Sequence, residues 1–490
     1  MLDNNKFILE EATIKSIHKA IVEKQINCKE LITMCIERIN KFDKKGISVN
    51  SIITINPHAL EMAKKLDEDF EKNGLVGPLH GIPVLLKDNI FTKDMKTTSG
   101  SILLKDFHPN RDAFIANKLI EAGAIILAKA NLHEFAIGGE TNNTLMGQTL
   151  NPYDVTRTPG GSSGGTAVGI AMNFGVIGLG TDTVNSVRSP SSACNLVGLR
   201  PTYGLLSKSG VIPSSINQDC VGIITRTVED LNLALNAMYG YDPDVTCTEI
   251  ANSYNKIESL DNEDFTLDGC RIGILKSFFG NDEIHTDVNK NMYNCIDMMK
   301  KAGAVFVDIE ENYDAVKLQQ STSVDLFEFK DALNEFLLKE GKELNVKSLS
   351  DILESGLYFK GIESSCIRAN SINREDNVDY EGRVARRLAM RKELNELTEK
   401  YNIDALVYPH QKRPVVKIGE SQLERNGILA SLLGYPAIVM PAGFTEKTDT
   451  APLGVPVGIE FLSCELKDSV LIKIAREFEK LSKFRRAPVI

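Results

Sequence analysis

The sequence lacks closely spaced cysteines and histidines. Its nine cysteines are an odd number, and no two of them form a Cys-x-x-Cys pair. Disulfide frameworks and structural zinc sites both use cysteines at short spacings, so we expect reduced and mostly buried thiols. The seven histidines are also dispersed, and neither a His-Glu-x-x-His nor a His-x-His pattern occurs. A histidine-based metal centre is therefore not expected.

Long apolar segments are missing as well. No run reaches about 18 consecutive apolar residues, which is the length that a membrane-spanning helix needs. The N-terminal segment MLDNNKFILEEATIKSIHKAIVEK does not show a basic start followed by an apolar core, which is the pattern of a secretory signal. We therefore expect a cytoplasmic protein that does not associate with a membrane.

The chain has no excess of positive charge. Its 490 residues carry a formal net charge of -10, and charged residues make up 25% of them. An acidic chain is a poor candidate for general nucleic-acid binding, although a local basic groove is compatible with it. Hydrophobic residues make up 42% of the chain. The length is therefore sufficient for a substantial core in one large domain or in several smaller ones.

Short apolar runs alternate with helical patterns through most of the chain. Residues 82–86 and 124–131 are typical of buried strands, whereas residues 468–484 have helical spacing. Alternation of this kind predicts an α/β fold with a sheet covered by helices on both faces. Residues from about 315 to 400 are more helical and more charged, which indicates a variable helical insertion. No linker rich in Pro, Gly and Ser divides the chain, so we expect residues 1–490 to form a single domain.

One stretch concentrates glycine and hydroxyl side chains. Residues 157–192 read RTPGGSSGGTAVGIAMNFGVIGLGTDTVNSVRSPSS. The apolar residues after the first Gly-Ser cluster argue against a flexible linker. A phosphate-binding loop is a second interpretation, but GxxxxGK[ST] is absent and no GxGxxG follows a suitable strand. A third is a hydrolase site, in which small residues let backbone amides approach a reacting carbonyl. The spacing alone leaves these alternatives open.

A serine nucleophile in this stretch needs a base. Residues 157–192 contain no histidine, and we do not interpret their Gly-Ser cluster as the GxSxG elbow that presents the serine of α/β-hydrolases. A Ser–Lys pair is the remaining arrangement. Lys87 is a candidate because it follows the apolar residues 82–86. A lysine at the end of such a run is expected to be partly buried, whereas most lysines are solvated.

Four motifs resemble those of the amidase signature family. In chain order they are GPLHGIPVLLKDNI, NPYDVTRTPGGSSGGTAVGIA, GLGTDTVNSVRSPSSACNLVGLRPTYGLLS and APLGVPVGIEFLS. The resemblance covers residues of about 60–235 and 400–490, which would form the signature core. It implies an α/β amidase-signature fold, with a large mixed β-sheet flanked by helices on both faces.

The resemblance also implies a catalytic triad of the Ser–cis-Ser–Lys type. Carried over by position, Lys87 is the base, Ser162 is the bridging serine and Ser186 is the nucleophile. Lys87 and Ser162 are 75 residues apart, and Ser162 and Ser186 are 24 apart, which fits the family pattern. The backbone N–H groups expected to form the oxyanion hole belong to Thr183, Val184, Asn185 and Ser186. The residues expected to support the site are Ser163, Asp182 and Arg188.

One residue pair departs from the family pattern. Val184-Asn185 stands where the family usually has Gly-Gly, which lets the backbone approach a substrate or adopt a positive φ. Asn tolerates a left-handed conformation, but a β-branched residue such as Val184 does not. The Val184 side chain is therefore expected either to point away from the site or to narrow the acyl pocket.

The resemblance implies an amide hydrolase that acts through an acyl-enzyme. It would cleave a small carboxamide to a carboxylic acid and ammonia or an amine, without a metal or an organic cofactor. A fatty acid amide hydrolase is disfavoured because no apolar membrane-binding cap is present. A homodimer is compatible with the sequence.

Two alternatives remain. One is a glutaminase similar to the A subunit of glutamyl-tRNA(Gln) amidotransferase, which would work with partner subunits and nucleic acid. In that protein an acidic residue holds the glutamine amine, and Glu424 lies near the comparable place. The other alternative is a catalytically silent binding protein that keeps the amidase fold.

Overall fold

The computed structural model describes residues 7–262 and 264–490. Within these residues, eleven strands form one sheet in the order β1-β3-β2-β4-β6-β5-β10-β11-β9-β7-β8. The strands are β1 (Ile52–Ile55), β2 (Pro83–Lys87), β3 (Ile125–Ala130), β4 (Ile177–Asp182), β5 (Val197–Arg200), β6 (Cys220–Thr225), β7 (Arg271–Leu275), β8 (Val305–Ile309), β9 (Ala405–Pro409), β10 (Ala437–Phe444) and β11 (Pro456–Leu462). Strand β2 runs parallel to β3 and β4, whereas successive pairs from β4 to β9 are antiparallel. The expected large mixed sheet is confirmed.

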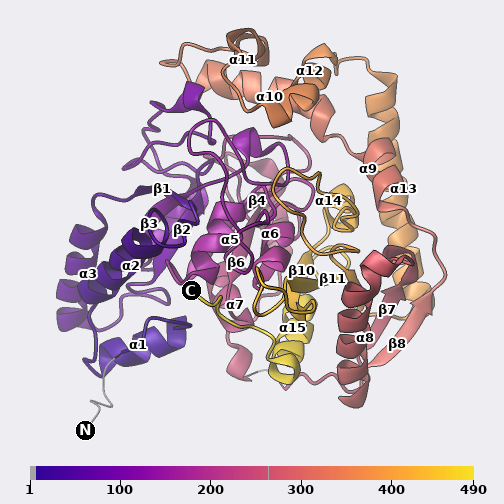
Figure 1. The fold of residues 1–490 in the computed structure, drawn as a ribbon, viewed down its shortest axis with the longest axis horizontal. Helices are drawn as coiled ribbons and strands as arrows, with labels where there is room; N and C mark the ends of the chain where they lie inside the picture. The colour runs from indigo at the N-terminus through magenta and orange to yellow at the C-terminus, as the bar shows by residue number, and fades with distance from the viewer. Residues whose placement is uncertain (1–6, 263) are drawn as a thin grey trace.

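Helices cover both faces of the sheet (Figure 1). On one face, α5 (Gly164–Ala171) and α6 (Arg188–Ala193) contact each other and the central strands. The helices on the other face, which contact one another in succession, are α4 (Phe114–Glu121), α7 (Val228–Met238), α15 (Asp468–Ser482) and α8 (Thr286–Lys301). Four more helices lie outside residues 315–401 of the described chain: α1 (Ile14–Val22), α2 (Cys28–Phe42), α3 (Ala59–Asn73) and α14 (Leu429–Leu433). The predicted α/β architecture with helices on both faces is therefore confirmed.

The first two helices begin at side chains that cap them. The Thr13 hydroxyl accepts the backbone N–H of Ser16 at 3.2 Å, and the Asn27 side chain accepts that of Glu30 at 2.8 Å. Both caps satisfy N–H groups that have no partner within the helix. The N-terminal region with helical spacing therefore forms two separate helices, and the second one begins after its cap, Asn27.

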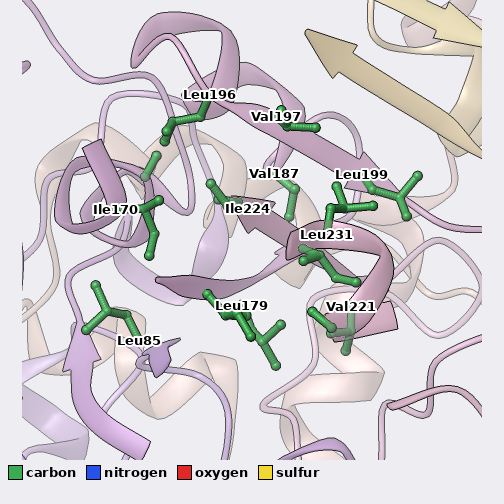
Figure 2. Close-up of a cluster of buried hydrophobic side chains, with 14 of the residues drawn as sticks. Leu85, Ile170, Leu179, Val187, Leu196, Val197, Leu199, Val221, Ile224 and Leu231 are labelled. Atoms are coloured by element: carbon green, nitrogen blue, oxygen red, sulfur yellow. The ribbon is translucent and has the colours of Figure 1, made fainter. Parts of the chain in front are cut away.

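Strands β4, β5 and β6 pack against α7, and β4 and β6 also pack against α5. Every residue of these three strands is buried. Figure 2 shows side chains from strands and helices meeting in this cluster, among them Leu85, Ile170, Leu179, Val187, Leu196, Val197, Leu199, Val221, Ile224 and Leu231. Helix α5 is buried on all sides, which explains why its sequence, GGTAVGIA, shows no polar face.

Glycines in the sheet let α5 and α6 lie close to the strands. A Cβ atom on Gly180 in β4 would lie 2.5 Å from the Ser163 Oγ, and one on Gly198 in β5 would lie 2.2 Å from the Ser191 Oγ. Both distances are shorter than a van der Waals contact. Because Gly180 and Gly198 have no side chains, the segments that carry Ser163 and Ser191 can pack directly against the sheet.

Five helices between residues 315 and 401 form a separate layer in the described structure. They are α9 (Ala315–Thr322), α10 (Asp325–Lys339), α11 (Leu349–Ser355), α12 (Glu363–Ser371) and α13 (Val378–Tyr401). In Figure 1, α10, α11 and α12 lie together at the top and α13 runs down the right side. Among the described residues, none of the helices combines the length and the apolar character needed to cross a membrane.

Candidate active site

Lys87 is the last residue of β2, which lies between β3 and β4 in the sheet. Its side chain is fully buried. The Nζ atom donates hydrogen bonds to the Ser162 Oγ and to the Thr181 Oγ1, each at 2.7 Å. The structure therefore brings together two of the three residues that the sequence predicts as a triad, although they are 75 residues apart.

Burial changes the ionisation of Lys87. Desolvation lowers its pKa from 10.5 to about 7, while the carboxylates of Asp219 and Asp182 oppose this shift. No carboxylate forms an ion pair with Lys87 in the described residues, and its hydrogen-bond acceptors are oxygen atoms of serine and threonine. A large fraction of Lys87 is therefore neutral near pH 7, and a neutral amine can accept a proton.

The first Gly-Ser cluster lies directly before α5. The peptide bond between Gly161 and Ser162 is cis. The backbone N–H of Ser163 donates to the carbonyl oxygen of Ser186 at 3.1 Å, and the Ser163 hydroxyl donates to the Thr181 carbonyl at 3.3 Å. These two bonds join the segments of Ser162 and Ser186 to the end of β4.

Ser186 lies in the turn between β4 and α6 and lines a cavity of about 300 Å³. Its side chain makes no hydrogen bond with the described residues, and the residue is 7% exposed. The backbone N–H groups of Val184, Asn185 and Ser186 likewise donate to no described residue. All three residues line the same cavity, together with Thr183. The turn thus offers a free hydroxyl and free N–H donors to a molecule in this cavity.

A buried charge network braces the turn. The Arg188 guanidinium donates to Asp182 at 3.0 Å, to Glu460 at 2.5 Å and to the carbonyl oxygen of Val184 at 2.7 Å. Asp182 also accepts the backbone N–H of Val187 at 3.0 Å and pairs with Arg200 at 3.1 Å.

The charge states of this network follow from its contacts. Burial raises the pKa of Asp182, but the cations of Arg188 and Arg200 outweigh it and hold this pKa well below its usual value. Asp182 and Arg188 therefore occupy the bracing positions that the sequence suggests for them, and neither lines the cavity.

The departure at Val184-Asn185 causes no backbone strain. Neither residue is among the described residues with a positive φ. Val184 is among the residues that line the cavity, and its side chain packs beside the apolar cluster that includes Ile428 and Leu429. A narrowing of the acyl pocket by Val184 stays a prediction. The Asn185 Oδ1 accepts a hydrogen bond from the Arg425 Nη1 at 3.3 Å.

Several residues of the cavity wall were not recognised in the sequence. They include His133, Glu140, Asp325, Ser365 and Arg425. Burial lowers the pKa of His133 to about 4, so its imidazole is neutral near pH 7. Helices α10 and α12 supply Asp325 and Ser365, so the helical layer closes one side of the cavity.

Glu424, in contrast, does not line the cavity. Its carboxylate lies 3.2 Å from the His285 Nε2 and 3.2 Å from the Arg413 Nε. The next residue along the chain, Arg425, lines the cavity instead. The acidic residue that the sequence places near a glutamine amine is therefore engaged elsewhere.

Comparisons with known proteins agree with the motifs. The family model described as Amidase matches residues 30–472. The A subunit of glutamyl-tRNA(Gln) amidotransferase from Thermoanaerobacter pseudethanolicus is 29% identical, and the match covers 98% of each chain.

Two solved structures have the same fold. The peptide amidase of Stenotrophomonas maltophilia superposes with a TM-score of 0.85 at 28% identity, over 98% of this chain and 99% of that one. The A subunit of glutamyl-tRNA(Gln) amidotransferase from Thermotoga maritima superposes with a TM-score of 0.74 at 26% identity, over 99% of this chain and 98% of that one. Because the family model spans most of the sequence, the chain belongs to the amidase family and is an enzyme that cleaves amide bonds.

Proposed function

We propose that the protein is an independent amide hydrolase that uses Ser186 as nucleophile, Ser162 as proton relay and Lys87 as base. The observation that carries the proposal is the hydrogen bond of 2.7 Å between the Lys87 Nζ and the Ser162 Oγ at a buried lysine whose pKa is about 7. A serine hydroxyl is a weak nucleophile, so its proton must be removed as it attacks. Neutral Lys87 can remove that proton through Ser162.

In the acylation step that we propose, Lys87 acts on the nucleophile through Ser162. Lys87 takes the proton of Ser162, Ser162 takes the proton of Ser186, and the Ser186 Oγ bonds to the amide carbonyl carbon. The negative charge that develops on the carbonyl oxygen is held by the N–H groups of Thr183, Val184, Asn185 and Ser186. Each such donor contributes about 3 kcal/mol to transition-state stabilisation.

The relay then works in reverse. Ser162 gives a proton to the departing nitrogen as the carbon–nitrogen bond breaks, and it recovers one from Lys87. Ammonia or an amine leaves, and the acyl group stays on Ser186. Water, deprotonated by the same relay, attacks the ester, and the acid is released. Every proton and electron pair is accounted for without a cofactor, so we propose that none takes part.

The cavity supports a small substrate. Its volume of about 300 Å³ is at the lower end of ligand pockets, and Val184 and Phe329 occupy part of its wall. A small carboxamide is therefore the substrate class that we propose. The cytoplasmic location, the absence of nucleic acid and membrane partners and a homodimeric state stay predictions from the sequence.

A glutaminase that works with partner subunits is the second candidate. The similarity to the Thermoanaerobacter protein over 98% of both chains favours it. The higher TM-score to the peptide amidase and the engagement of Glu424 by His285 and Arg413 favour the independent hydrolase. The free N–H donors in the turn before α6 argue against a catalytically silent protein.

Ammonia release by the purified chain tests the proposal. Aliphatic, aromatic and amino-acid amides and glutamine are offered to the wild type, to Ser186→Ala and to Ser365→Ala. Ser365 lines the same cavity and has no hydrogen-bonding role in the proposed relay, so Ser365→Ala is the matched control. Turnover that is lost only in Ser186→Ala supports the hydrolase. Turnover of glutamine alone, and only with partner subunits, supports the second candidate, and retention of turnover in Ser186→Ala excludes Ser186 as the nucleophile.

A further inference from the structure

Arg425 is a cation in the wall of the cavity, and Glu140 is the carboxylate that influences its pKa. Its Nη1 donates to the Asn185 Oδ1 at 3.3 Å, and this is its one side-chain hydrogen bond with the described residues. Within the same described ranges it forms no ion pair with a carboxylate. A guanidinium group carries five N–H donors in a planar fork, so most of its donors are free to bind a molecule in the cavity.

Two carboxylates near Arg425 in the chain or in the cavity have other contacts. The Glu140 carboxylate accepts the backbone N–H of Gly139 at 3.2 Å and lies 3.4 Å from the neutral His133 ring, whose Nδ1 accepts the backbone N–H of Glu140 at 3.3 Å. Glu424 is engaged by Arg413 and His285, away from the cavity. Burial lowers the pKa of Arg425, and the carboxylate of Glu140 only partly opposes this effect. Arg425 is half-buried, and a charge that is partly removed from water without a direct partner is costly, so an anion in the cavity would relieve that cost.

A third carboxylate shares the cavity, at α10. Asp325 accepts a hydrogen bond from the Ser323 hydroxyl at 2.7 Å. Burial raises the pKa of Asp325, and Glu328 and Asp219 add to this effect. Among the described residues Asp325 forms no ion pair with Arg425, so the guanidinium keeps free donors beside Asn185.

The position of the guanidinium is fixed by its surroundings. Asn185, which accepts its hydrogen bond, directly precedes Ser186 in the chain. On another side, a Cβ atom on Gly139 would lie only 2.4 Å from the Arg425 Nη1. The backbone of Gly139 thus provides the space that the guanidinium occupies. Arg425 is placed next to the nucleophile by contacts that a longer residue at 139 would disturb.

We propose that Arg425 binds a carboxylate of the substrate, so that the enzyme prefers amides that carry a carboxylate near the scissile bond. The planar fork of an arginine matches the two oxygens of a carboxylate. This inference rests on the proposed hydrolase function and names its substrate class. The carboxylate can belong to the acyl part, as in the half-amide of a short dicarboxylic acid, or to the leaving amine, as in an N-acyl amino acid.

Substrates with the carboxylate on either side of the scissile bond distinguish a carboxylate of the acyl part from one of the leaving amine. Malonamate, succinamate and glutaramate carry the carboxylate on the acyl side, and N-acetylglycine carries it on the amine side. Each is compared with its own methyl ester, which removes the charge and keeps the shape. Release of ammonia, or of glycine and its methyl ester, gives kcat/KM for the wild type, for Arg425→Gln and for Arg413→Gln. Arg413 lies outside the cavity and is paired with Glu424, so Arg413→Gln is the matched control.

The ratio of kcat/KM between an acid and its ester is the decisive quantity. For at least one pair we expect the wild type to favour the acid, and Arg425→Gln to lower the ratio by about 10- to 100-fold, the range for a charge-assisted hydrogen bond. Arg413→Gln is expected to leave the ratio unchanged. If the wild type shows no preference for any acid, or if Arg425→Gln lowers both members of each pair equally, the proposal is wrong.

A binding measurement keeps this inference separate from the hydrolase proposal. Malonate, succinate, glutarate and N-acetylglycine are titrated into the wild type and Arg425→Gln, and the midpoint of thermal unfolding is followed. A rise in the midpoint that occurs in the wild type and is lost in Arg425→Gln supports a carboxylate site even if no amide is cleaved. No rise with any of these anions overturns the carboxylate site, and turnover of neutral amides in the same protein then leaves the hydrolase proposal intact.

Discussion

The ionisation of Lys87 gives the most direct prediction for the proposed mechanism. Burial lowers its pKa from 10.5 to about 7. Because each pKa unit corresponds to about 1.4 kcal/mol, the buried site favours the neutral amine by about 5 kcal/mol relative to a solvated lysine. If neutral Lys87 is the base, kcat/KM rises tenfold per pH unit below about pH 7 and becomes constant above it.

A substitution of Asp219 tests the direction in which the pH profile shifts. Among the carboxylates that favour the ammonium form of Lys87, Asp219 contributes most. Removing its charge therefore lowers the pKa of Lys87, and the rising part of the profile moves to lower pH in Asp219→Asn. Asp468→Asn is the control, because Asp468 is also buried but contacts Thr202 and does not influence Lys87.

The assay is ammonia release from a neutral amide between pH 5 and about pH 9.5, with circular dichroism at each pH to confirm that the protein stays folded. A neutral substrate is used because it does not titrate. A wild-type profile whose midpoint lies above about pH 9 would refute the argument, since it would mean that burial does not neutralise Lys87. A shift to higher pH in Asp219→Asn would show that another group titrates.

Two further predictions concern the packing that supports the site. Glu460→Gln removes one charge of a buried ion pair with Arg188, so we expect a loss of about 3–5 kcal/mol in the free energy of unfolding, measured with urea; an unchanged midpoint would show that Arg188 does not depend on this partner. Gly180→Ala places a Cβ atom 2.5 Å from the Ser163 Oγ, so we expect a loss of about 1–3 kcal/mol and reduced activity. Gly382→Ala is its control, because the nearest atom to the added Cβ lies 3.5 Å away, and equal effects of the two substitutions would contradict the packing argument.

The sequence predicts which segments form strands and helices better than it predicts how the strands pair in the sheet. Apolar runs identify β2 and β3, and helical spacing identifies α15, because one periodicity or one apolar run suffices for each of these elements. Strand β5 is only four residues long, and β11 stands out in the sequence solely as part of a motif. Their places in the sheet depend on antiparallel pairing with β10, which lies far from β5 in the chain. Pairing of distant segments is not encoded in any local pattern.

The residues of the candidate site also differ in whether the sequence predicts them. Lys87 can be singled out because a lysine at the end of a buried strand is unusual, and the motifs place Ser162 and Ser186 with it. Arg425 gives no such signal, since it lies in a polar stretch and meets Asn185 across 240 residues. The sequence also leaves open whether Val184 is forced into a positive φ, and the structure shows that it is not.

The two sides of the cavity are encoded by different parts of the gene. The proposed proton path and its donors come from residues 87–186, whereas Gln319, Asp325, Phe329 and Ser365 come from the helical layer. Mutations in that layer can therefore alter what fits the cavity without touching the bond-breaking groups. A library confined to residues 319–365 would search for new acyl preferences while the chemical step is inherited unchanged. The arrangement makes the enzyme easy to diversify, in evolution as in the laboratory.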